Sequence, residues 1–324
     1  AIAAGRAELV LAGGTEALSH APVLLPEDTV AWLARWYRSG TMERVRLLAQ
    51  IKPAFLSPVI GLAHGLTDPI CGLGMGQTAE ILRYRFSIAR TDADRYALRS
   101  HQRLAAAQSA GFLDEIEPMF SPDGRCHRSD EGLRPDSTLE QLGALEPAFE
   151  RPFGEVTAGN SSQITDGACW LVLASAQALE RHDLTPLARI VDSQWAALPP
   201  AIMGLGPVFA CTALLQRRQL AFEDIAFWEI NEAFAAQVLA CVAAWEDTQF
   251  CREHLGLAAA PGGIAPDRLN VDGGAISLGH PVGTSGARIV LHLARILQRA
   301  EARYGVASEC IGGGQGGAML LERP

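Results

Sequence analysis

Three short stretches in the last third of the chain carry side chains that could do acyl chemistry. They are 231–234 (Asn-Glu-Ala-Phe), 279–281 (Gly-His-Pro) and 310–314 (Cys-Ile-Gly-Gly-Gly). The imidazole of His280 can take a thiol proton and then donate a hydrogen bond to a developing oxyanion. The carboxamide of Asn231 can hold a water that completes an oxyanion hole. An amide, an imidazole and a thiol together suggest chemistry on a thioester.

Each of these side chains also has a purely structural interpretation. Cys310 can be a buried small apolar residue before a glycine-rich hairpin, and His280 can be a loop histidine. Asn231 can be the N-cap of the helix that follows it. For Cys310 taken alone, the structural interpretation is the better one. The glycines after it are also compatible with a functional role, because they let a substrate approach backbone N–H groups that point into a cavity. The occurrence of all three stretches in one chain favours a shared site.

The elements that must position these residues alternate between strands and helices. Buried strands are predicted at 8–14, 168–174 and 226–230, and a pair of strands joined by glycines at 306–310 and 318–321. Helices are predicted at 90–110, with Thr91 as N-cap, and at 284–303, where Thr284 or Ser285 can cap. This alternation favours an α/β body.

Residues 20–160 differ from the rest in their frequent prolines and in a polar loop at 123–143, and we expect them to cover the active face of the body. Within them, residues 29–67 carry Arg35, Arg38, Arg44, Arg46 and Lys52 against Glu43 alone, together with many aromatic and aliphatic residues. This pattern predicts a basic amphipathic helix followed by an apolar loop. Such a helix either packs on its own domain or offers a surface to an anionic membrane or a partner subunit.

Composition bounds the remaining possibilities. With 27 basic and 36 acidic residues, the net charge of −9 argues against a nucleic-acid partner. No apolar run is long enough to cross a bilayer. The seven cysteines are scattered, odd in number and without metal-type spacing. We therefore expect reduced thiols, a cytoplasmic protein and no metal.

The order of the three stretches, and the residues around them, resemble the thiolase family over nearly the whole chain. The further matching segments are 12–16, 75–80, 156–162, 166–168 and 203–208. The resemblance implies the thiolase fold, an α/β fold layered αβαβα with two similar core halves and an inserted covering (loop) domain. The implied division is the remainder of the N-terminal core half at 1–19 and 161–183, the covering domain at 20–160 and the C-terminal core half at 184–324.

The resemblance also implies roles for the chemical residues. In thiolases a histidine equivalent to His280 activates a nucleophilic cysteine, and a cysteine equivalent to Cys310 moves the proton on the α-carbon of the acetyl unit. An asparagine equivalent to Asn231 orders a catalytic water. The backbone N–H at the position of Gly312 helps to hold the carbonyl of the acyl-enzyme.

Three further residues match positions that bind the substrate in this family. Met75 and Phe234 match residues that line the acyl and pantetheine pocket. Ser193, after a one-residue gap, best matches a serine that contacts the pantetheine arm of CoA. CoA and acyl-CoA are then substrates, and no permanently bound cofactor is implied.

The implied activity is that of an acyltransferase that cleaves 3-ketoacyl-CoA with CoA, giving acetyl-CoA and a shortened acyl-CoA, as in fatty-acid β-oxidation. Gly74, where many short-chain biosynthetic thiolases have histidine, and the long stretch between Gly14 and Met75 resemble the β-subunit type of the fatty-acid oxidation complexes. The alternative within the same class is acetoacetyl-CoA synthesis by the reverse condensation.

The nucleophilic cysteine of the family would lie shortly upstream of Ala1. The opening residues 1–5 (Ala-Ile-Ala-Ala-Gly) look like the end of an amphipathic helix that stops at Gly5, so we expect a fragment. An alternative of another class is a non-catalytic CoA-binding or scaffold subunit. The resemblance implies a homodimer or tetramer, and residues 29–67 leave open a hydratase/dehydrogenase subunit or peripheral membrane contact.

Overall fold

The computed structural model describes residues 1–324, and its centre is a four-stranded sheet with the order β7-β10-β9-β8. The strands are β7 (Arg189–Ala197), β8 (Phe227–Ile230), β9 (Tyr304–Ile311) and β10 (Gln315–Glu322). β10 runs antiparallel to both neighbours, whereas β8 runs parallel to β9, with Ile230 opposite Ser308. Parallel pairing places the carboxyl ends of β8 and β9 at one edge. Asn231 follows the first of these ends, and Cys310 lies at the second.

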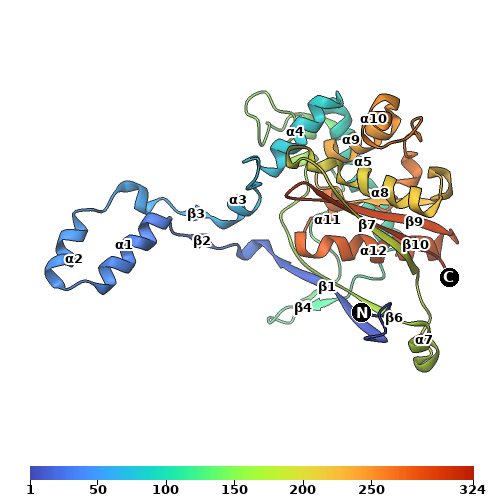
Figure 1. Cartoon of the computed structure of the whole chain (residues 1–324), viewed down its shortest axis with the longest axis horizontal. Helices are drawn as coiled ribbons and strands as arrows, with labels where there is room; N and C mark the ends of the chain where they lie inside the picture. Colours follow the sequence, from blue (N-terminus) through green and yellow to red (C-terminus); the bar gives the residue numbers. More distant parts are fainter.

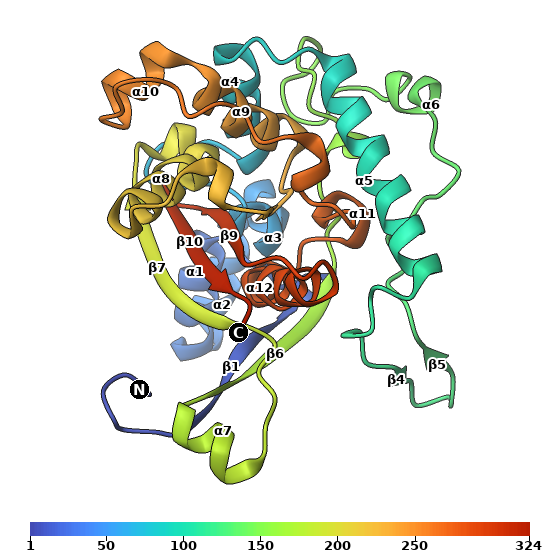
Figure 2. The ribbon, with the colours of Figure 1, turned by 90° about the vertical axis from the view of Figure 1, so that its right-hand side faces the viewer.

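Helices cover both faces of this sheet. α8 (Gly206–Arg218) packs on β7, β9 and β10, and α9 (Ala235–Glu246) packs on α8. α12 (Val282–Arg299) packs on the opposite face (Figure 2). Neighbouring residues of β9 show the alternation, because Ser308 is near Cys211 of α8 while Glu309 lies against Gly286 of α12.

The main hydrophobic core lies on the α8 side of the sheet. The rings of Trp228 on β8 and Trp245 on α9 are fully buried, with their centroids 5.7 Å apart. The indole N–H of Trp245 donates to Oγ1 of Thr212 at 3.1 Å, which satisfies the polar group of that ring inside the core. A second, smaller core joins α12 to the other face of the sheet.

A separate two-stranded sheet lies beyond α12. It consists of β1 (Leu9–Ala17) and β6 (Asp166–Ala174), paired antiparallel with Gly13 opposite Trp170. Both strands pack on α12, which is therefore held between the two sheets (Figure 2). A Cβ at Gly14 would lie 2.0 Å from the carbonyl oxygen of Gly283, so the approach of β1 to the start of α12 requires glycine. α7 (Ala176–His182) follows β6.

The strands predicted at 8–14 and 168–174 exist, but the prediction that they are buried is wrong. Burial alternates along both, and Leu11 and Val172 are 64% and 68% exposed. One face packs on α12, and no other element of the chain covers the second face. An apolar run predicts burial on both faces only when both faces have a partner.

Much of the inserted segment lies over the C-terminal half of the molecule. α4 (Met75–Arg85) packs on α9 and on the 3-10 helix η4 (Pro200–Leu205), and α5 (Arg90–Ala110) packs on α9 and α11 (Ala275–Leu278). The smaller elements between 111 and 160 are β4 (Met119–Phe120), β5 (Cys126–His127), α6 (Leu139–Gly143) and the 3-10 helix η3 (Ala158–Asn160). α5 has the predicted bounds, although its N-cap is Ala89, which places Thr91 inside the helix.

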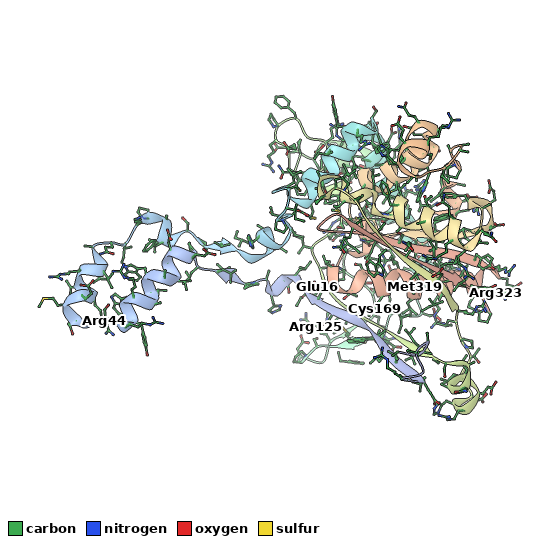
Figure 3. The ribbon with its side chains drawn as sticks, in the orientation of Figure 1. Glu16, Arg44, Arg125, Cys169, Met319 and Arg323 are labelled. Carbon is green, nitrogen blue, oxygen red and sulfur yellow. The ribbon has the colours of Figure 1, made fainter.

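Residues 22–65, which we call the arm, extend away from the body (Figure 1). They contain β2 (Val23–Leu24), α1 (Glu27–Arg38), α2 (Thr41–Leu48), the 3-10 helix η2 (Pro53–Leu56), β3 (Val59–Ile60) and α3 (Gly61–Gly65). The helices pack on each other: the indole N–H of Trp32 donates to the carbonyl of Leu47 at 3.0 Å, and Leu47 is fully buried. Arg44 marks the far end (Figure 3). The arm therefore does not cover the body, contrary to the expectation for residues 20–160.

Two other features differ from or add to the expectations. Residues 1–5 form turns rather than a helix end, and the N–H of Gly5 donates to the carbonyl of Ile2. No helix combines the length and the apolar character needed to span a bilayer.

Candidate active site

Asn231 lies directly after β8 and is fully buried. Its N–H donates to the carbonyl of Ser308 at 2.9 Å, which extends the parallel pairing by one residue. α9 begins only at Ala235, with Phe234 as its N-cap, so the interpretation of Asn231 as a helix cap is wrong. The side-chain nitrogen instead lies 3.3 Å from Nε2 and 3.5 Å from Nδ1 of His280. Its Oδ1 is buried and has no protein partner, which leaves it available to a water or a substrate donor.

His280 lies in the loop between α11 and α12. The backbone N–H of His280 donates to the carbonyl of Gln163 at 3.1 Å. Gly279 has a φ of +104°, and a Cβ there would lie 2.4 Å from Thr165, so the turn before His280 needs glycine. α12 starts at Val282 with Pro281 as N-cap, so neither of the predicted caps, Thr284 and Ser285, serves that role.

Ser285 orients the imidazole. Its Oγ lies 2.7 Å from Nδ1 of His280 and donates to the carbonyl of Pro281 at 3.2 Å. A hydroxyl has one proton, so donation to Pro281 leaves Oγ to accept from Nδ1–H. The tautomer assigned in this way leaves Nε2 without a proton and able to act as a base.

Burial lowers the pKa of His280 to about 4, and the nearby positive charge of Arg288 contributes in the same direction. The imidazole is therefore neutral near pH 7. A neutral imidazole can accept a proton from a thiol, which is what a general base must do.

Cys310 lies near the end of β9, opposite Gly316 of β10. With Met75 it packs against a small apolar cluster that contains Ala233 and Phe234. Burial raises the pKa of Cys310 to about 12, and the negative charge of Glu309 adds to the shift. The group at neutral pH is thus the protonated thiol, which suits a proton donor better than a nucleophile.

Gly312, Gly313 and Gly314 form the turn between β9 and β10. Gly313 and Gly314 have φ values of +81° and +80°, which favour glycine. The N–H of Gly312 donates to no protein acceptor. Met75 lies next to it, with its Sδ 4.0 Å from the place a Cβ of Gly312 would occupy. The turn therefore presents a free N–H donor beside Cys310 and Met75.

All the predicted site residues except Ser193 come together in this region. Residues 231–234 connect His280 with the apolar cluster around Cys310, since Asn231 contacts His280 while Phe234 packs in that cluster. Ser193 lies on β7, the outer strand of the sheet, where it is exposed and pairs with Met319, labelled in Figure 3. Strand β10 separates Ser193 from Cys310, and the backbone carbonyl of Ser193 accepts a hydrogen bond from Arg217. The structure does not place Ser193 at the site.

Apart from Ser285, two serines just after the inserted segment lie beside the site, Ser161 and Ser162. The N–H of Ser162 donates to the carbonyl of Ala233 at 2.9 Å, and Ser161 pairs with Phe234. They belong to the matching segment 156–162, which the sequence pointed to without giving either serine a role.

Glu232 is a residue that sequence reasoning missed, although it stands inside the first stretch. Its carboxylate is fully buried and accepts from four groups on distant segments: Tyr96 (2.9 Å), Ser100 (2.7 Å), Asn270 (3.1 Å) and the N–H of Ile276 (3.3 Å). Glu232, which directly follows Asn231, is thereby held to α5 and to the segment that leads to His280. Its only signal in the sequence was its place beside Asn231, because its partners are far along the chain.

A neutral base, a protonated thiol and free backbone and amide groups can move a proton next to a carbonyl and hold the oxyanion that results. The structure has no cluster of three or more His, Cys, Asp or Glu side chains suited to a metal ion. The groups that meet at this site can supply acid–base and hydrogen-bonding chemistry.

Comparison with known proteins agrees with acyl chemistry at this site. Residues 1–177 match the family described as thiolase, N-terminal domain, and residues 184–323 match thiolase, C-terminal domain. The chain is 40% identical over 320 residues to the mitochondrial 3-ketoacyl-CoA thiolase of Rattus norvegicus, covering 98% of this chain and 72% of that protein. It is 41% identical over 327 residues to the β-ketoadipyl-CoA thiolase of Pseudomonas aeruginosa, covering 100% of this chain and 74% of that protein. The crystal structure of human mitochondrial 3-ketoacyl-CoA thiolase in complex with CoA matches with a TM-score of 0.82 and 39% identity, covering 100% of this chain and 73% of that one.

Proposed function

Because this chain belongs to the thiolase family, we propose that it cleaves 3-ketoacyl-CoA with CoA, giving acetyl-CoA and a shortened acyl-CoA. It has the thiolase fold and is an acyltransferase, and thiolases use CoA as a substrate without a permanent cofactor. The observation that carries the proposal is the contact of Asn231 with His280 at 3.3 Å, next to the apolar cluster that holds the Cys310 thiol.

The proposed chemistry assigns one role to each group. A nucleophilic thiol of the protein gives its proton to Nε2 of His280 and adds to the 3-keto carbon. The bond from that carbon to C2 then breaks, and its electron pair passes to the acetyl thioester as an enolate. Nε2 of His280, once protonated, and a water on Asn231 hold the enolate oxygen. The Cys310 thiol gives its proton to C2, which completes acetyl-CoA. The Gly312 N–H holds the carbonyl of the acyl group that stays on the protein.

The second half-reaction transfers this acyl group to CoA. The CoA thiol gives its proton to the Cys310 thiolate and attacks the acyl carbonyl. The sulfur of the protein leaves as a thiolate and takes back the proton that His280 holds. Met75 and Phe234 line the place for the acyl and pantetheine chain in this proposal, and their packing beside Cys310 supports it. Ser162 replaces Ser193 as our candidate for contact with the pantetheine arm, because it lies against Ala233.

We propose the degradative direction, with condensation to acetoacetyl-CoA as the alternative. Gly74 before Met75 and the long segment between Gly14 and Met75 support the choice. A series of 3-ketoacyl-CoA substrates of increasing length separates the two, since a degradative enzyme turns over the longer members as well as acetoacetyl-CoA.

The experiment measures thiolysis by the full-length protein with that substrate series. Activity should fall strongly in His280→Ala and Cys310→Ala. The control is Ser193→Ala, a substitution on the outer strand away from the site, which should keep normal rates. Activity that survives both site substitutions would contradict the assignment. Binding of CoA without any turnover would instead support a scaffold subunit.

We also propose the organisation expected from the sequence, with core halves at 1–19 plus 161–183 and at 184–324, and an inserted segment at 20–160. The two family matches support it, since the first ends at 177 and the second begins at 184.

The exposed apolar face of β1 and β6 supports a homodimer or tetramer, which sedimentation tests. Seven free cysteines support a reducing, cytoplasmic setting, which cell fractionation tests.

The arm is our proposed contact surface for an anionic membrane, with a hydratase/dehydrogenase subunit as the alternative. Basic side chains at Arg35, Arg38 and Arg46 accompany large exposed apolar ones: Val30, Leu33, Tyr37, Met42, Val45 and Leu48. Replacing 27–56 with a short flexible linker should abolish sedimentation with anionic vesicles, while zwitterionic vesicles bind neither form. Equal sedimentation of both forms would contradict membrane contact.

A further inference from the structure

A carboxylate from the inserted segment holds the glycine turn of the candidate site. Oδ2 of Asp68 accepts the N–H of Gly313 at 2.8 Å, although the two residues are 245 positions apart. Asp68 is only 2% exposed. Its other oxygen, Oδ1, accepts the N–H groups of Ile70 and Cys71 at 2.8 and 3.1 Å. Three backbone donors, two local and one distant, thus converge on one buried side chain.

The segment that carries Asp68 is itself well fixed. The N–H of Asp68 donates to Leu73, the N–H of Gly72 donates back to Asp68, and Thr67 pairs with Gly74. The hairpin of residues 66–75 then runs directly into α4, which packs on α9 and η4. The N–H of Cys71 above all, with those of Ile70 and Gly313, keeps the pKa of Asp68 below its ordinary value. The group that meets Gly313 is therefore an ionised carboxylate at a fixed place.

A run of three glycines has no side chains to fix its own conformation. The hydrogen bond from Gly313 to a buried carboxylate is charge-assisted and therefore of the stronger kind. With the Gly313 N–H held, the neighbouring Gly312 N–H, which has no protein acceptor, is fixed in direction. The same hairpin ends at Met75, whose Sδ lies beside Gly312. One short segment thus sets both the donor and a wall of the acyl site.

We propose that Asp68 is a positioning residue that orients the Gly312 N–H for the acyl carbonyl, an inference that rests on the proposed function. An oxyanion donor is effective only when it already points at the place where charge develops, because reorientation during the reaction costs free energy. Asp68 touches no substrate in this assignment. It acts through Gly313, and its removal should reduce the rate of acyl transfer rather than the binding of CoA.

Asp68→Asn separates this role from simple support of the hairpin. The amide oxygen of asparagine can still accept from Ile70 and Cys71, so the local turn keeps its hydrogen bonds. Its amino group then faces the N–H of Gly313, donor against donor, and the distant bond is lost. The matched control is Asp247→Asn. Asp247 also accepts a backbone N–H, that of Phe250 at the start of α10 (Thr248–His254).

The test combines kinetics with amide hydrogen exchange on the full-length protein. For Asp68→Asn we expect kcat to fall about 10- to 100-fold while KM for CoA changes less than about twofold. Peptides that contain residues 312–314 should exchange faster than in the unmodified protein. Asp247→Asn should change neither quantity.

An unchanged kcat, or unchanged exchange at 312–314, would overturn the positioning role of Asp68. A rise in KM with normal kcat would also overturn it, because that result indicates lost ground-state binding. If the unmodified protein shows no thiolysis, the proposed function fails first. The exchange measurement still decides whether Asp68 fixes the glycine turn.

Discussion

The side-chain nitrogen of Asn231 lies 3.3 Å from Nε2 of His280, across 49 positions of sequence. Asn231 follows the end of β8, and His280 stands in the loop that enters α12, so the contact joins an edge of the sheet to the helix on one of its faces. Glu232, one residue further on, binds the segment before His280 through Asn270 and through Ile276 of α11. The contact is thus supported by a buried polar network rather than by two isolated side chains.

The pH dependence of activity should report the neutral state of His280. Because burial lowers the pKa of His280 to about 4, the acid limb of kcat/KM should lie near that pH, well below the ordinary histidine value. Asn231→Asp places a negative charge beside the ring, which favours imidazolium and should move the limb up by about 1–3 pH units. A limb at the same pH in both proteins would contradict the assignment of His280 as the base.

Ser285→Ala should lower kcat by about tenfold or more, because the imidazole loses the partner that fixes its tautomer and orientation. The acid limb of the pH profile should move as well, whereas a change of structure alone would leave it in place. Ser109→Ala is the control. This exposed serine of α5 donates to the carbonyl of its own helix at Ala105, and its loss should leave the profile unchanged.

Cys310 should resist alkylation at neutral pH. With its pKa raised to about 12, very little thiolate exists near pH 7, and iodoacetamide should label the exposed Cys126 first. Burial raises the pKa of Glu309 to about 7, so this carboxyl is ionised at pH 8. Glu309→Gln removes its negative charge, and Cys310 should then react faster at pH 8 than in the unmodified protein. Peptide mapping by mass spectrometry measures both rates. Labelling of Cys310 as fast as Cys126 at pH 7 would show that the thiol is not held protonated.

The stability of the fold should fall at alkaline pH because of His292. Burial lowers the pKa of His292, but hydrogen bonds with Asp272 (3.1 Å) and Glu115 (2.6 Å) outweigh it and raise the pKa to about 9. Because the pKa of His292 is higher in the folded state, protonation of His292 stabilises the fold, and this contribution is fully present below about pH 6.5, the pKa in the unfolded chain. That contribution is lost as the pH rises through about 9, with an upper magnitude of about 3 kcal/mol.

Urea unfolding at pH 6.5 and pH 9.5 measures this loss. In His292→Gln the difference between the two pH values should become much smaller, because the titrating group is gone. His182→Gln, at the exposed end of α7, is the control and should retain the difference found in the unmodified protein. An equal difference in His292→Gln and the unmodified protein would show that another group causes the alkaline loss.

Local patterns predicted the elements near the site well. The apolar runs at 306–310 and 318–321 and the glycines between them correspond to β9 and β10, and the helix predicted at 90–110 is α5 with the same bounds. These signals are local, since strand and helix periodicity and glycine turns depend on neighbouring residues. The prediction of Asn231 as a helix start failed because three more non-helical residues follow it before α9 begins.

Side-chain types in the sequence determined the chemistry available to this protein: an amide at 231, an imidazole at 280, a thiol at 310 and glycines after it. Tertiary structure alone decided which of them meet. It excluded Ser193, gave Glu232 and Asp68 their partners, left one face of β1 and β6 open and held the arm away from the body. The physical reason is that burial and long-range hydrogen bonds depend on which distant segments pack together, and no local pattern records that choice.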